Sequence, residues 1–152
     1  MAGLVIAGLR LAVAGVFLYA GTLKIWDFTH LRSATPDFTI AIQNFRLLPL
    51  PDLAVLLAVY LPWLEVTAAS ALFIRRLALG AATALLGLSA VFLGAVGSAW
   101  WRGLDIACGC FGKENAPTDF RFLLLRNTAL LAAVAVLFLH EWRRPPPTPP
   151  HP

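Results

Sequence analysis

A long apolar stretch, residues 53–100, reads LAVLLAVYLPWLEVTAASALFIRRLALGAATALLGLSAVFLGAVGSAW. Each half of it is long enough to cross a bilayer, for which a helix needs about 20 apolar residues. The adjacent Arg75 and Arg76 separate the two halves. Two spanning helices joined by so short a polar link run antiparallel and lie side by side. The stretch therefore predicts a helical hairpin in a membrane.

Similar apolar runs occur on both sides of this hairpin, so the predicted spans are residues 4–23, 53–74, 77–100 and 120–140. The chain is 59% hydrophobic and 13% charged, whereas soluble domains have about a quarter of charged residues. We predict an all-α polytopic membrane protein, with an antiparallel four-helix transmembrane bundle over residues 1–142. The first run contains Arg10 and has no basic segment before it, so we expect a retained span and not a cleaved signal peptide.

Two segments outside the spans have distinct patterns. Thr35-Pro36-Asp37 combines a capping hydroxyl, a proline at the first helical position and an acid in the first turn. Apolar residues follow at helical spacing, namely Phe38, Ala41, Ile42 and Phe45. The first long loop is therefore expected to contain a short amphipathic helix on the membrane surface. Residues 143–152 are rich in proline and are expected to form a disordered tail.

Basic residues indicate how the chain is oriented, because Lys and Arg accumulate on the cytoplasmic side. With four spans, both termini lie on the same side as Arg75-Arg76, close to Arg143-Arg144. We expect this side to be the cytoplasmic face of the membrane, with the loop between the third and fourth spans on the outer face. The basic residues form no stripe, so no nucleic-acid partner is expected.

Charged residues inside the predicted spans are costly and are usually paired or functional. Arg10 and Glu65 lie at similar estimated depths, so we predict an ion pair between them. The pair would fix helix register, or Glu65 would relay protons or contact a cofactor. Pro62 would kink the second span, and its neighbours Tyr60 and Trp63 could line a pocket for a flat hydrophobic ligand such as a quinone.

The loop before the fourth span contains Cys108-Gly109-Cys110-Phe111-Gly112, with the only two cysteines of the chain. A disulfide across one residue closes a small, strained ring that is easily reduced, which suits electron transfer better than bracing. Positive charge stabilises a thiolate, and the candidates for this are Lys24 and Arg126, with Asn127 beside the arginine. The pattern favours a redox-active cysteine pair on an oxidising face of the membrane.

Two other functions are compatible with the same residues. Cys108 and Cys110 could bind a soft metal such as Cu(I), although Met1 is the only methionine available for a copper path. Alternatively, the chain is a non-catalytic subunit of a membrane complex or a homo-oligomer. Independently of these alternatives, small residues recur along the third span and predict a helix-packing face, which would matter most for such a subunit: Gly80, Ala84, Gly87, Ala90, Gly94 and Gly97.

Four motifs together resemble the MauE branch of the DoxX-like membrane proteins, and the similarity extends to about Trp142. They are FLYAGTLK at residues 17–24, LPWLE at residues 61–65, CGCFG at residues 108–112 and LRN at residues 125–127. The resemblance implies a four-helix membrane protein that forms or maintains disulfides in exported proteins, alongside a thioredoxin-like partner. It further implies a thiol–disulfide oxidoreductase similar to DsbB and vitamin K epoxide reductase, which pass electrons to a quinone.

This chain departs from those quinone-linked enzymes in its number of cysteines. They use two cysteine pairs, one that meets the partner and one near the quinone, whereas this chain has a single pair. A direct relay would therefore have to work through Cys108 and Cys110 alone, or the protein would serve as an accessory subunit. The residues do not indicate the direction of electron flow or which cysteine attacks first.

Overall fold

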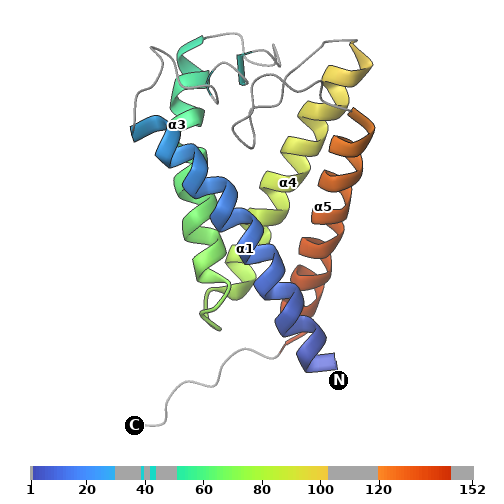
Figure 1. Cartoon of the computed structure of the whole chain (residues 1–152). Coiled ribbons are helices and arrows are strands. Elements are labelled where there is room, and N and C mark those ends of the chain that lie inside the picture. The colour runs from blue at the N-terminus through green and yellow to red at the C-terminus, as the bar shows by residue number, and fades with distance from the viewer. Residues whose placement is uncertain (1, 30–38, 40–41, 44–50, 103–119, 145–152) are drawn as a thin grey trace.

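Four long helices dominate the computed structural model, which describes residues 2–29, 39, 42–43, 51–102 and 120–144. They are α1 (Ala2–Thr29), α3 (Pro51–Ala71), α4 (Ala78–Trp101) and α5 (Phe120–Trp142). The start of α1, the turn between α3 and α4 and the end of α5 lie at one end of the bundle (Figure 1). This up-down arrangement confirms the predicted all-α, four-helix fold.

All four helices are long and apolar enough to cross a membrane, over Gly3–Trp26, Asp52–Ala71, Ala78–Trp101 and Arg121–Trp142. Their outer faces expose large apolar side chains, among them Leu4, Val91 and Phe122. Contiguous apolar surface of this kind is unfavourable in water and is what a lipid environment requires. The chain is therefore a multi-pass membrane protein, as predicted.

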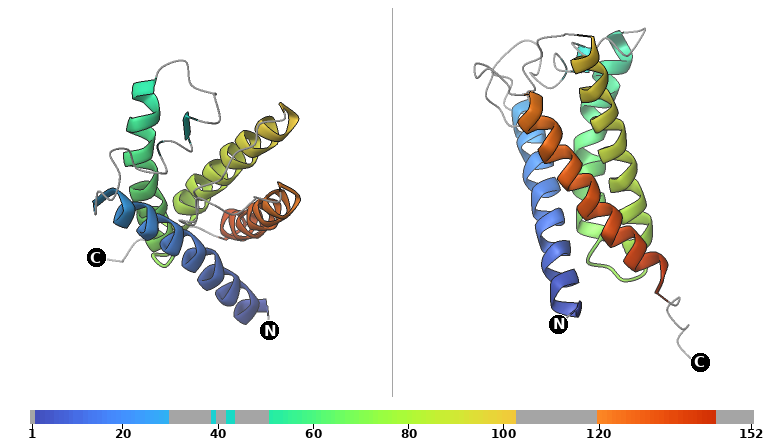
Figure 2. Two further views of the ribbon diagram at one scale, coloured as in Figure 1. Left: turned by 45° about the horizontal axis from the view of Figure 1, so that its top comes forward. Right: turned by 90° about the vertical axis from the view of Figure 1, so that its right-hand side faces the viewer.

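The helices form two packed pairs that meet closely toward one end of the bundle. α1 packs along α3 and α4 packs along α5, with fewer contacts between the pairs. The main hydrophobic core takes side chains from all four helices near the α3–α4 turn, including Val13, Ala69, Leu85 and Leu137. Toward the other end, the described residues form a smaller cluster from α4 and α5, which contains Val96, Ala99 and Leu123. α3 and α4 diverge from their shared turn (Figures 1 and 2).

The small residues that α4 buries against its neighbours are not the glycines that the sequence predicted. Its buried positions are Ala78, Ala81, Ala82, Leu85, Ser89, Val96 and Ala99. In contrast, Gly80, Gly87 and Gly94 are exposed, and a methyl group added to any of them would meet no atom of the described residues within 4 Å. The expectation that these glycines form the packing face is wrong within the described chain, because the alanines turn toward the neighbouring helices.

Gly21 allows a close approach between α1 and α3. A β-carbon at this position would lie 2.8 Å from Cγ2 of Val66 and 3.1 Å from the carbonyl oxygen of Pro62. Real β-carbons almost never approach another atom as closely as the 2.8 Å to Val66, and the 3.1 Å to Pro62 is tighter than most real contacts. The Pro62 contact is with backbone, which cannot rotate away as a side chain could. The α1–α3 pair therefore depends on the absence of a side chain at Gly21.

Replacing Gly21 with alanine is expected to lower the free energy of unfolding by about 1–3 kcal/mol, the usual cost of overpacking. Gly87→Ala is the matched control, because its added methyl group meets open space. This control is expected to be neutral or to stabilise by up to about 1 kcal/mol, since alanine is the better helix former. Chemical unfolding of the detergent-solubilised variants measures both. Equal effects of the two substitutions would contradict the proposed tight contact.

Parts of two predictions lie outside the described residues. The amphipathic surface helix falls in the first long loop, of which only Thr39, Ile42 and Gln43 are described, and these three are helical. The proline-rich tail, residues 143–152, is described only for Arg143 and Arg144.

Candidate functional site

A buried ion pair joins the two helices of the first pair. The ammonium group of Lys24 on α1 donates to both carboxylate oxygens of Glu65 on α3, at 2.7 and 2.8 Å. The two side chains are 7% and 9% exposed. A charge in such a position is tolerated because its partner offsets the loss of hydration. The Lys24–Glu65 ion pair therefore links α1 to α3 at the level where these two helices separate from α4 and α5.

The predicted pairing of Arg10 with Glu65 is wrong. The guanidinium of Arg10 instead binds the carboxylate of Glu141 at the end of α5, and Arg144 lies 3.4 Å from the same carboxylate. Arg10 and Lys24 are separated by about 21 Å along α1 at 1.5 Å per residue. Because α1 is inclined across the bundle (Figure 1), Arg10 near its start reaches α5, whereas Lys24 near its end reaches α3. Depths counted along separate helices could not reveal this inclination.

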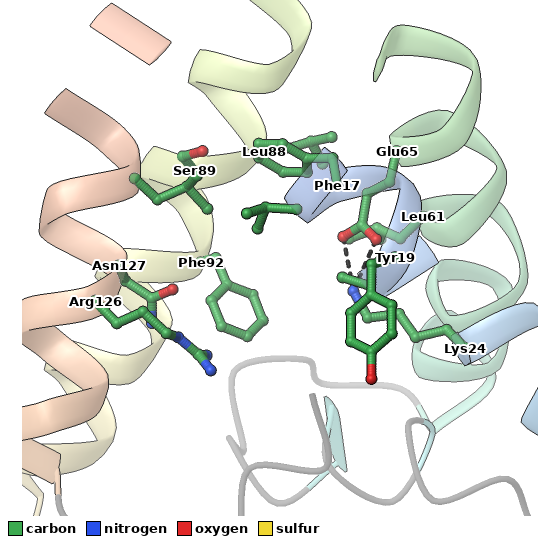
Figure 3. A pocket seen from close by; sticks show the side chains of 13 residues that line it. Phe17, Tyr19, Lys24, Leu61, Glu65, Leu88, Ser89, Phe92, Arg126 and Asn127 are labelled. Atoms are coloured by element: carbon green, nitrogen blue, oxygen red, sulfur yellow. Dashed lines mark hydrogen bonds and ion pairs between the residues drawn. The ribbon is translucent and has the colours of Figure 1, made fainter. Parts of the chain in front are cut away.

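A cavity of about 340 Å³ opens between the two helix pairs. One wall comes from α1 and α3, and the other from α4 and α5 (Figure 3). The wall is mostly apolar, with contributions from Val16, Phe17, Ala20, Leu61, Leu88, Phe92 and Leu130. Volumes of 300–1,000 Å³ with few polar groups are typical of sites for small molecules. The divergence of the helix pairs thus creates a space of ligand size.

The polar groups of this cavity come from opposite walls. Tyr19, Lys24 and Glu65 lie on one side, and Ser89, Arg126 and Asn127 on the other (Figure 3). Ser89 and Asn127 are 6% and 7% exposed. Among the residues that the structure describes, Ser89 Oγ and Asn127 Nδ2 have no hydrogen-bond partner. Buried polar groups are nearly always satisfied, so these two atoms mark a place where a partner is missing.

Four of these six polar residues were predicted as site residues from the sequence, whereas Tyr19 and Ser89 were not. Lys24 and Arg126 were expected to stabilise a thiolate, and the structure brings both to one cavity together with Asn127. Ser89 lies in the middle of a span rich in small residues, where it is indistinguishable from a packing residue. Its burial beside a cavity is visible only in the tertiary structure.

The expected pocket beside Pro62 differs from the cavity found. Tyr60 and Trp63 are 68% and 56% exposed, so they face outward and do not line the cavity. Leu61 and Glu65, on the other face of the same helix, line it instead. That part of the prediction is wrong because the aromatic residues that flank Pro62 are turned away from the other helices.

Known proteins show similarity to this chain over most of its length. The family model described as methylamine utilisation protein MauE matches residues 2–140. The chain belongs to the MauE family. The methylamine utilization protein MauE of Paracoccus denitrificans is 35% identical over 137 residues, which cover 87% of this chain and 69% of that protein. No solved structure matches this chain.

The MauE match includes all cavity-lining residues and the loop that contains Cys108 and Cys110. This loop, residues 103–119, lies outside the described part of the structure, and so do the predicted roles of Gly109, Phe111 and Gly112. Its two ends are attached to Trp101 of α4 and Phe120 of α5. Arg126 and Asn127 lie in the second turn of α5, close along the helix to where the loop ends.

In this MauE-family chain, the ion-pair cluster of Arg10, Glu141 and Arg144 is expected to stabilise the fold. Glu141→Gln is expected to cost about 1–3 kcal/mol, because it leaves the Arg10 guanidinium, 16% exposed, without its carboxylate. Arg144→Gln is the control. Its pair with Glu141 is more exposed, and its loss is expected to cost less than about 1 kcal/mol. Thermal unfolding in detergent measures both, and a larger effect of Arg144→Gln would contradict this ranking.

Proposed function

We propose that the chain is a membrane thiol–disulfide redox protein that exchanges a disulfide with a thioredoxin-like partner through Cys108 and Cys110. The observation that carries the proposal is the placement of this cysteine pair in the chain. The chain's two cysteines stand in the segment that joins α4 to α5. The cavity between the helix pairs contains Arg126 from the second turn of α5 and Lys24 from the last two turns of α1.

The exchange between the partner's two thiols and the Cys108–Cys110 disulfide needs no further oxidant or reductant. A thiolate of the partner attacks one sulfur of the oxidised pair, so that a mixed disulfide forms and the other cysteine leaves as a thiolate. The partner's second thiolate then attacks the mixed disulfide and releases the reduced pair. Two electrons and two protons have then moved from the partner to Cys108 and Cys110. The same steps in reverse carry reducing equivalents outward.

The setting proposed for this exchange is the outer face of a bacterial inner membrane. Arg75, Arg76, Arg143 and Arg144 adjoin the helix ends at one end of the bundle, and paired arginines of this kind mark the cytoplasmic side. Trp101 and Phe120, which flank the cysteine segment, then lie at the opposite, oxidising face. The name of the related protein suggests that the exported partner serves methylamine utilisation.

Thiol counting on the purified protein separates this proposal from metal handling. For an exchangeable disulfide, alkylation is expected to label both cysteines after treatment with a reductant and neither before it. For a soft-metal site, a chelator alone would expose both thiols, and one metal ion per chain would be lost with them. The second result would overturn the redox proposal. The redox proposal would also be overturned if both thiols were alkylated before as well as after reduction and exchanged with no disulfide.

A further inference from the structure

Two uncharged polar groups of the cavity lack hydrogen-bond partners among the described residues. Ser89 lies at the middle of α4, and its hydroxyl and the Asn127 amide nitrogen are buried without hydrogen-bond partners there. Both side chains project from the α4–α5 wall of the cavity (Figure 3). A buried donor left unsatisfied destabilises the fold. Two such groups in one cavity are therefore better explained by a ligand than by packing.

The chemistry of these groups specifies the kind of ligand. Asn127 Nδ2 is a donor and the Ser89 hydroxyl can donate, so the ligand must present acceptor oxygens. The Lys24 ammonium already binds both oxygens of Glu65, so this charge does not call for an anion. Tyr19 and Arg126 also line the cavity, and each of them already has an interaction within the chain. The remaining wall is apolar, and the site reaches the middle of the spans, where a charged headgroup is costly.

We propose that this cavity binds a neutral, lipid-soluble carbonyl compound of the quinone class, with a carbonyl oxygen accepting from Asn127 and Ser89. The ring would occupy the space between Phe17, Leu88 and Phe92, and an apolar tail would leave between the diverging helix pairs.

Binding does not depend on the cysteines, whereas a role in electron transfer rests on the function proposed above. The chain has a single cysteine pair, so it can hold one electron pair and needs a second carrier for repeated turnover. A quinone and two thiols interconvert with a hydroquinone and a disulfide, with transfer of two electrons and two protons. The cavity is the part of the described chain that could hold such a carrier within the membrane.

The test is a titration of the full chain in detergent with a para-benzoquinone that carries a short alkyl tail. Ser89→Ala and Asn127→Leu each remove one donor, and each is expected to weaken binding about 5–10-fold, as the loss of one hydrogen bond of about 1–1.4 kcal/mol predicts. Ala20→Phe fills the cavity from the opposite wall while every polar residue of the chain is kept, and it is expected to abolish binding. Thermal unfolding confirms that each variant is folded.

Two substitutions outside the cavity serve as controls. Ser98→Ala removes a hydroxyl from the same helix as Ser89, but this hydroxyl bonds to the Ala95 carbonyl. Thr128→Val changes the exposed neighbour of Asn127. Both are expected to bind the probe as the original chain does. Unchanged affinity in Ser89→Ala, Asn127→Leu and Ala20→Phe would overturn the proposal, and so would displacement of the probe by an anionic phospholipid at equal concentration.

The cysteine variant keeps this inference separate from the proposed function. A Cys108→Ser/Cys110→Ser chain is expected to bind the quinone probe with unchanged affinity. Disulfide exchange in a chain that binds no quinone would refute the cavity proposal and leave the function intact. Quinone binding in a chain that exchanges no disulfide would refute the function and leave the cavity proposal intact.

Discussion

Glu65→Leu is expected to lower the free energy of unfolding by about 3–5 kcal/mol, the usual cost of removing one partner from a buried ion pair. The substitution leaves the Lys24 ammonium, 7% exposed, without its carboxylate. Lys24→Met is expected to have an effect of similar size, because it strands the Glu65 carboxylate. Chemical unfolding in detergent measures these losses.

The double variant Lys24→Met/Glu65→Leu is the control for this prediction. It leaves neither charge buried and replaces both with apolar side chains of similar size, so most of the lost stability is expected to return. The four chains form a double-mutant cycle, whose coupling energy reports the interaction itself. If either single variant were as stable as the original chain, or if the double variant lost the sum of both effects, the ion pair would not link α1 to α3 as described.

Cys108→Ser/Cys110→Ser is expected to abolish disulfide exchange completely, because these are the only thiols in the chain. Each single variant is also expected to fail in turnover, since one cysteine cannot regenerate an internal disulfide. The measurement is the thiol state of exported proteins in native membranes, by alkylation before and after reduction. At least one exported protein should change its thiol state, and the sign of that change gives the direction of electron flow.

A spacing control sharpens this prediction. The variant Cys108→Ser/Ser98→Cys keeps two cysteines in the chain but places one of them within α4. It is expected to be as inactive as the double serine variant, because the function requires two thiols in one short loop. Normal exchange in this variant, or in the double serine variant, would rule out chemistry at the Cys-Gly-Cys motif.

The fold was predictable because lipid imposes a simple length rule. An apolar run of about 20 residues has few alternatives to a spanning helix, and Arg75-Arg76 leaves room only for a turn. The face that each helix turns inward was less predictable. In α4 both alanines and glycines are small, and nothing in the pattern distinguishes Ala82, which is buried, from Gly80, which is exposed.

The candidate site was predictable in its members but not in its pairings. Lys24, Glu65, Arg126 and Asn127 are conspicuous because polar groups are rare in spanning helices. The partner of each depends on helix inclination, which is why Arg10 was wrongly assigned to Glu65. Ser89 was missed because a serine commonly satisfies itself on its own helix, as Ser70 and Ser98 do. Its missing partner is a property of the folded bundle.

The most direct test of the proposed exchange is to trap its intermediate. Cys108→Ser and Cys110→Ser are expressed separately in native membranes. Disulfide exchange is quenched with acid, free thiols are alkylated, and protein adducts are then separated by electrophoresis with and without reductant. One of the two variants is expected to accumulate a mixed disulfide with a thioredoxin-like exported protein, because the resolving cysteine is absent. If neither variant forms a reducible adduct while both retain the fold of the original chain, the protein does not exchange disulfides through this pair.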